Sequence, residues 1–128
     1  MNLLLDTHVA LWAITDDPKL STKAREMLLA PRNTVWVSAV NVWEIAIKHS
    51  LGREAMPVSG QEALQYFRQA GYQFLVVEPE HAAIVEDLAN HHQDPFDRLL
   101  VAQALAEPMR LLTHDVMVSR YSDTIILV

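Results

Sequence analysis

The sequence predicts a single α/β domain over residues 1–128, a three-layer sandwich in which helices cover both faces of a central, mainly parallel sheet. Short aliphatic and β-branched runs alternate with helical patterns along the whole chain, which is typical of strands joined by crossover helices. The first run, Leu3-Leu4-Leu5, is apolar at every position, as expected of a strand buried on both faces. Only three glycines occur, which argues against an all-β protein with many tight turns.

Each expected element has a local signal. Ser21 and Ser38 are suitable N-cap residues in front of helical patterns, and Gly52 is suited to end the second of these helices. Pro79 and Pro95 stand where a proline fits the first turn of a helix. The strands are short β-rich runs between turn signals. In chain order we expect strands at 3–5, 34–37, 72–77, 110–113 and 124–128, and helices at 8–14, after 21, and at 38–51, 60–70, 79–90 and 95–106.

Composition narrows the class of protein. Hydrophobic residues make up 51% and charged residues 20%, so we expect an ordered chain, and no apolar run is long enough to span a membrane. The absence of cysteine excludes thiolate chemistry and, with an N-terminus unlike a signal peptide, fits a cytoplasmic location. The net charge of -6 counts against a nucleic-acid binder, although an enzyme that gathers acids around a divalent cation can be acidic overall.

Four acids stand at the ends of expected strands or near the starts of expected helices. Asp6 follows the first strand directly, and Asp115 comes two residues after the strand at 110–113. Glu44 and Asp97 lie within the first turns of their helices. Because the carboxyl ends of parallel strands meet at one edge of a sheet, we expect these four side chains to converge there.

Glu44 is the most informative of these acids. Its helix has apolar residues nearly all round, so the carboxylate is expected to have little contact with water. A buried carboxylate needs a cation, a hydrogen-bond donor or a bound proton. The alternative to a metal-binding role is an ion pair with Lys48, which lies four residues on and on the same helix face.

The aspartates each have a structural interpretation as well. Asp6 and Asp94 are suitable N-caps, and Asp115 is suited to a turn or a helix cap. Asp97 stands at the third position of its helix, where an acid suits the helix dipole. Taken one at a time these interpretations are favoured, and only the joint placement of the acids favours a metal site.

Histidines and tryptophans carry weaker signals. The six histidines lack the spacing of a zinc-binding helix, so we expect them in loops or at the surface. The three tryptophans are expected in the core or at an interface rather than as platforms for nucleobases. Trp12 is the one that we single out for substitution.

Four segments, taken together, resemble the PIN-domain VapC-type toxins in order and spacing, and they extend over nearly the whole chain. The resemblance implies that the four acids above form the catalytic and metal-binding set. Thr113 matches the small hydroxyl residue before the last acid, and Thr7 and Arg98 are further supporting residues. The segments are Leu3-Leu4-Leu5-Asp6-Thr7-His8, Val37-Ser38-Ala39 with Trp43-Glu44-Ile45-Ala46, the run from His91 to Ala104, and Leu111-Leu112-Thr113-His114-Asp115.

The same resemblance implies a metal-dependent endoribonuclease with an RNA substrate, a homodimer, and neutralisation by a cognate VapB-type antitoxin. Hard cations such as Mg²⁺ or Mn²⁺ prefer oxygen ligands, which the acids supply. We expect Asp6 and Asp97 to bind the ion directly. Glu44 and Asp115 would bind through water, orient the nucleophile or hold a second ion. For Arg98, a contact to phosphate and a solvated charge at a helix start remain equal alternatives.

Two other functions remain open. A metal-dependent phosphatase or phosphotransferase can also begin with a strand followed by an acid, but the haloacid-dehalogenase type has a second acid two residues later. This chain has His8 at that position. A non-catalytic metal-binding interaction module is the third hypothesis, and the presence of all four acids counts against it.

Overall fold

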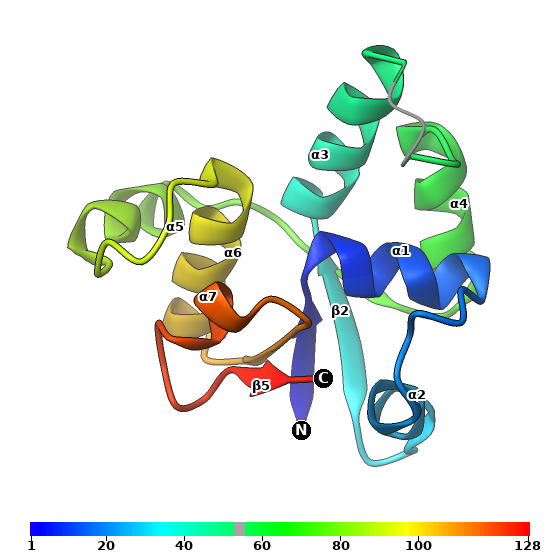
Figure 1. Cartoon of the computed structure of the whole chain (residues 1–128), viewed down its shortest axis with the longest axis horizontal. Helices are drawn as coiled ribbons and strands as arrows, with labels where there is room; N and C mark the ends of the chain where they lie inside the picture. The colour runs from blue at the N-terminus through cyan, green and yellow to red at the C-terminus, as the bar shows by residue number, and fades with distance from the viewer. Residues whose placement is uncertain (53–55) are drawn as a thin grey trace.

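The computed structural model describes residues 1–52 and 56–128 and contains a five-stranded sheet in the order β3-β2-β1-β4-β5 (Figure 1). All four neighbouring pairs run parallel, so the predicted α/β class with a parallel central sheet is confirmed. The first strand in the sequence, β1, occupies the centre of the sheet, between β2 and β4. The strands are β1 (Asn2–Leu5), β2 (Thr34–Ser38), β3 (Gln73–Leu75), β4 (Arg110–Thr113) and β5 (Ile126–Leu127).

Two helices begin at the serine caps that were expected, Ser21 and Ser38, and α4 begins at Ser59, which the sequence analysis did not single out. The side chains of Ser21, Ser38 and Ser59 each accept a hydrogen bond from a backbone N–H in the first turn of the following helix. Across the described parts of the chain, no helix is both long and apolar enough to cross a bilayer. The helices are α1 (Thr7–Thr15), α2 (Thr22–Leu29), α3 (Ala39–Ser50), α4 (Gly60–Gln69), α5 (Pro79–Ile84), the 3₁₀ helix η1 (Val85–Asp87), α6 (Pro95–Ala106) and α7 (Val116–Ser119).

The sheet separates two hydrophobic cores. Alternate residues of a strand point to opposite faces, so Leu3 and Leu5 enter one core while Leu4 enters the other. Phe67 of α4 and residues of α1 and α2 fill the first core, and Leu100 of α6 belongs to the second. Figure 1 shows the same division, with α1, α2 and α4 on one side of the sheet and α6 and α7 on the other. Because helices cover both faces of the sheet, only the ends of the central strand can contribute to a functional site.

Both outer strands are shorter than predicted. The strand expected at 72–77 ends at Leu75, the last residue paired with β2, and Val76 beyond it is 60% exposed. The strand expected at 124–128 has only two residues, which pair with Leu112 and Thr113 at the end of β4. An outer strand has only one neighbouring strand, so its length depends on how far that neighbour extends. The strand propensity of local residues does not predict this.

The helix predicted at 79–90 is wrong in its second half. It ends at Ile84 and continues only as the short 3₁₀ helix η1. Arg98, from α6, donates hydrogen bonds to the carbonyl oxygens of Val85 (3.2 Å) and Ala89 (3.0 Å). In a continuous α-helix, carbonyl groups accept hydrogen bonds from backbone N–H groups of the same helix. In this segment two carbonyl groups accept hydrogen bonds from Arg98 of another helix.

Candidate active site

Asp6 is fixed at the edge where β1 and β4 end. Its N–H donates to the carbonyl of Leu112 (3.0 Å), and its side chain is 4% exposed. One carboxylate oxygen, Oδ1, accepts from the N–H of Val9 (2.8 Å), so Asp6 is the N-cap of α1. The other, Oδ2, accepts from the hydroxyl of Thr113 (2.5 Å) on β4. Each oxygen retains a second lone pair, so capping and metal binding are compatible at this residue.

Glu44 lies on α3 with 2% of its surface exposed, as its apolar helix predicted. Oε1 accepts from the hydroxyl of Thr7 (2.5 Å), and Oε2 lies 2.5 Å from the ammonium group of Lys48. The amide of Asn41 donates to Thr7 Oγ1 and to the carbonyl of Leu5, both at 3.1 Å. The ion pair considered as an alternative is therefore present, and Thr7 ties the carboxylate to the end of β1.

Asp97 lies in the first turn of α6, behind the N-cap Asp94, whose Oδ1 accepts from the N–H groups of Phe96 and Asp97. Burial raises the pKa of Asp97 to about 7, and the nearby carboxylates of Asp94, Asp6 and Glu44 act in the same direction. A hydrogen bond from His92, whose Nε2 lies 3.2 Å from Asp97 Oδ2, acts in the opposite direction. Three other acids thus surround Asp97 closely enough to disfavour its charge.

Asp115 completes the group from the carboxyl end of β4, next to β1. It is the N-cap of α7 through the N–H of Met117 (2.8 Å), and its own N–H donates to Thr113 Oγ1 (3.0 Å). The neighbouring His114 places Nδ1 3.9 Å from Asp6 Oδ2. The nearby carboxylate of Asp6 raises the pKa of this imidazole, and those of Asp115 and Asp97 add to the effect. Asp115 and Asp97 therefore lie near the same imidazole as Asp6.

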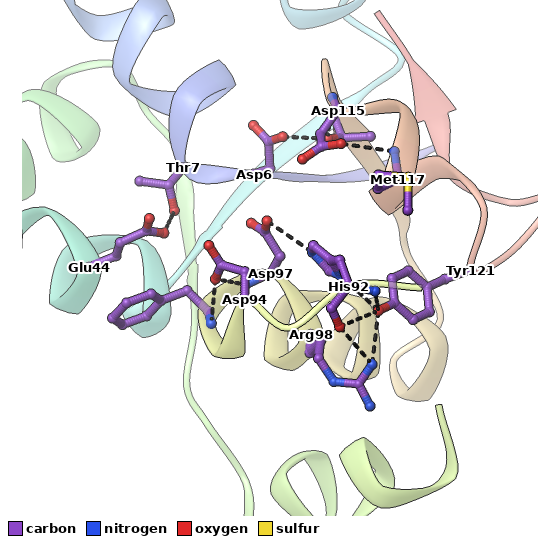
Figure 2. A network of polar contacts seen from close by, with 12 residues as sticks. Asp6, Thr7, Glu44, His92, Asp94, Asp97, Arg98, Asp115, Met117 and Tyr121 are labelled. Atoms are coloured by element: carbon purple, nitrogen blue, oxygen red, sulfur yellow. Dashed lines mark hydrogen bonds and ion pairs between the residues drawn. The ribbon is translucent and has the colours of Figure 1, made fainter. Parts of the chain in front are cut away.

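The four acids predicted from the sequence face a shared space. Figure 2 shows Asp6 and Asp115 on one side of it, Asp97 with Asp94 on the other, and Glu44 at its flank. They come from the end of β1, from α3, from α6 and from the start of α7. Residues spread over more than a hundred positions are thereby brought to one edge of the sheet, where parallel sheets collect ligands.

This donor set fits a hard divalent cation. It offers carboxylate oxygens, the ligands that Mg²⁺ and Mn²⁺ prefer, and a cation would favour the charged form of Asp97. Within residues 1–52 and 56–128, no three carboxylate or imidazole side chains are already arranged so that they could hold a metal ion. Several of their oxygens instead accept bonds from Thr7, Lys48 and Thr113. Mg²⁺ keeps several of its waters and needs few carboxylates, so it can bind some of these carboxylates through water.

Arg98 contacts the segment that precedes α6. Its guanidinium group donates to the backbone carbonyls of Val85 and Ala89 and to the hydroxyl of Tyr121 (2.9 Å). Figure 2 shows the group on the side of α6 away from Asp6. These bonds hold the segment before α6 against Tyr121, and a contact of Arg98 to phosphate stays a prediction.

Sequence analysis missed a second layer of residues behind Asp97. The hydroxyl of Tyr121 lies 2.7 Å from Nδ1 of His92, whose Nε2 faces Asp97. The only sequence signal was the position of His92 five residues before Asp97, in a segment without periodicity. The prediction that all histidines lie in loops or at the surface is wrong for His81, which is 2% exposed and lies 2.5 Å from Glu107 Oε2.

Comparisons with known proteins bear on this arrangement. A family model described as PIN domain matches residues 3–123. The solved VapBC2 from Rickettsia felis, bound to a DNA fragment from its promoter, gives a TM-score of 0.72 at 22% identity, over 100% of this chain and 98% of that chain. VapBC-1 from nontypeable Haemophilus influenzae gives 0.67 at 18% identity, over 100% and 97%. A search of curated proteins finds no match. At these identities the two structures are evidence of a shared fold.

Proposed function

The chain belongs to the PIN-domain family, and on that premise we propose that it is a divalent-metal-dependent endoribonuclease with Asp6, Glu44, Asp97 and Asp115 as its catalytic acids. The observation that supports this most is that four elements bring these acids to one edge of the sheet, where burial and the neighbouring carboxylates of Asp94, Asp6 and Glu44 raise the pKa of Asp97 to about 7. Such crowding is costly unless a cation relieves it, and it is typical of sites that bind metal ions.

We infer that the ion is Mg²⁺ or Mn²⁺, with Asp6 and Asp97 as its closest ligands and Glu44 and Asp115 acting through water. When bound, such an ion polarises a phosphodiester and lowers the pKa of a water molecule. The chain's own contribution is to hold the carboxylates in place. Thr113 holds Asp6, and Thr7 holds Glu44, each through a hydrogen bond of 2.5 Å. Ligands fixed in advance do not have to be ordered when the substrate binds.

The substrate and the partners are part of the same proposal. We propose that the chain is the toxin of a VapBC-type pair, since the two solved relatives are VapBC proteins. It would then be neutralised by a cognate VapB-type antitoxin and form a homodimer. Size-exclusion chromatography with light scattering should give twice the 14.5 kDa of one chain, and the product of a small neighbouring reading frame should copurify. A monomer that captures no such product would contradict this part of the proposal.

Cleavage of a structured RNA by the purified protein tests the activity. We expect cleavage with Mg²⁺ or Mn²⁺, none with EDTA, and a loss of at least about 100-fold in Asp6→Asn and Asp97→Asn. Asparagine is as good an N-cap as aspartate, so Asp6→Asn should still fold. Asp123→Asn, at an exposed position outside the acid group, is the matched control. Unchanged cleavage in both site variants would remove the metal-site proposal.

A small phosphate ester separates this function from the phosphatase alternative. Turnover of p-nitrophenyl phosphate by a protein that leaves RNA intact would favour the alternative. We expect the reverse, because the haloacid-dehalogenase type needs an acid where this chain has His8.

A further inference from the structure

Three aromatic rings lie together beside Asp6. His8 and Trp12, four residues apart on one face of α1, have ring centroids 5.9 Å apart. His114, between β4 and α7, lies 4.7 Å from the ring of Trp12 and 5.2 Å from that of His8. The interplanar angles are 41°, 62° and 77°, so the rings meet at an angle and none is stacked parallel on another.

These rings are accessible from solvent. His8 is exposed, the side chain of His114 is 40% exposed, and Trp12 is half-buried. All three line a pocket of about 390 Å³, together with Leu11 and Pro57. Trp12 therefore packs against the hydrophobic core, as expected from the sequence, and also lines an open cavity.

The charges in this pocket do not suit a phosphate. Lys19 and Asp17 both line it with opposite charges, and the imidazole of His114 already lies near the acids Asp6, Asp115 and Asp97. A phosphate site would need an excess of cations or a set of converging N–H donors. An uncharged planar group fits better, because the rings supply apolar faces and the polar side chains stand among them.

We propose that His8, Trp12 and His114 form a nucleobase-binding subsite, in which a base next to the cleaved phosphodiester stacks on Trp12. The proposal rests on the proposed ribonuclease function and adds to it a site for substrate recognition. His114 connects the two, since its Nδ1 is 3.9 Å from Asp6 Oδ2. A nucleotide whose phosphate lies at the acids thus has an aromatic surface directly beside it.

The overall charge of the chain gives a second reason. With ten Lys and Arg and a net charge of -6, the protein has few phosphate contacts to offer an RNA strand. Stacking of bases on aromatic side chains supplies affinity that does not depend on positive charge, and every base has a face that can stack. A subsite of aromatic rings therefore supplies binding affinity for RNA that the few cationic side chains of this chain do not.

Binding of single nucleotides tests the subsite without any cleavage. In the metal-free full-length protein, adenosine 5'-monophosphate should shift the indole N–H resonance of Trp12 and leave that of Trp43 in place, while ribose 5-phosphate should shift neither. Trp12→Leu keeps an apolar side chain but loses the aromatic face, so we expect affinity to fall about 5- to 150-fold. Trp12→Phe should stay close to the original affinity, and Trp43→Leu is the matched control.

Two results with other probe molecules, and one with a variant, would overturn the proposal. One is an equal shift with ribose 5-phosphate, which would make the pocket a phosphate site. The other is binding of N-acetyl-tryptophanamide at Trp12 without binding of the nucleotide, which would make it a site for a protein side chain. An unchanged nucleotide affinity in Trp12→Leu, with the fold intact by circular dichroism, would have the same consequence.

The outcome is separable from that of the proposed function. Asp97→Asn should lose RNA cleavage and still bind the nucleotide, which supports both proposals. Nucleotide binding at Trp12 in a protein that cuts no RNA would support the subsite and contradict the nuclease. RNA cleavage with no nucleotide binding at Trp12 would support the nuclease and contradict the subsite.

Discussion

Glu44 and Asp97 are both withdrawn from water at the same edge of the sheet, yet their surroundings differ. Glu44 accepts hydrogen bonds from Thr7 and from the ammonium group of Lys48. Asp97 faces other acids, and its hydrogen bond comes from His92. One side of the site thus includes a permanent cation and the other does not. The comparison teaches that an added cation is needed chiefly on the Asp97 side, while the Glu44 side is already held in place.

Removing the cation from the Glu44 side should have the largest effect on stability. We expect Lys48→Met to lower the free energy of unfolding by about 3 kcal/mol, because it leaves the buried carboxylate of Glu44 without its ionic partner. Urea denaturation measures the change, and Lys48→Arg serves as the control. The double variant Lys48→Met, Glu44→Gln should recover most of the loss. No recovery would show that Lys48 acts through its packing and not through the ion pair.

The Asp97 side should respond to pH. Its pKa of about 7 in the folded protein lies above the ordinary 3.8, so between these values the folded state holds a proton that the unfolded state has lost. The free energy of unfolding of the metal-free protein should therefore fall as the pH rises from about 4 to about 7, by about 1 kcal/mol per pH unit at most. Asp97→Asn should flatten this slope in thermal unfolding curves. Equal slopes in the original protein and in Asp97→Asn would contradict the raised pKa of Asp97.

A smaller effect is expected from the residues behind Asp97. Tyr121→Phe removes the hydroxyl that bonds to His92 and to Arg98, and should lower the free energy of unfolding by about 1 kcal/mol. If His92 orients Asp97, the same change should weaken Mn²⁺ binding about tenfold, as is typical of residues behind metal ligands. Titration calorimetry measures the affinity. Tyr66→Phe, on the exposed face of α4, is the control.

The parts of the fold that sequence predicted best are those with local signals. Leu3-Leu4-Leu5 and the serine caps are recognisable from neighbouring residues, and the structure places β1, α2 and α3 as expected. The end of α5 was not predictable in this way, because it depends on Arg98 from another helix. The short outer strands depend likewise on the length of their one neighbour.

The same distinction holds within the candidate site. The acids follow strands or begin helices, so the topology of a parallel sheet was enough to predict that they converge. His92 and Tyr121 come from segments outside any predicted helix or strand, and their contact joins residues 29 positions apart. Nothing in the local pattern marks such a pair, and only the folded chain reveals it.

The hydrogen bond between Asp6 and Thr113 joins residues 107 positions apart, across two adjacent strands at the centre of the sheet. During translation, β1 emerges before β4 and has no partner on that side until Thr113 has been synthesised. A nascent chain that stops before Thr113 lacks the strand that closes the sheet beside β1, and Asp115 is absent as well. The order of synthesis thus delays assembly of the four acids until β4 and Asp115 have been translated.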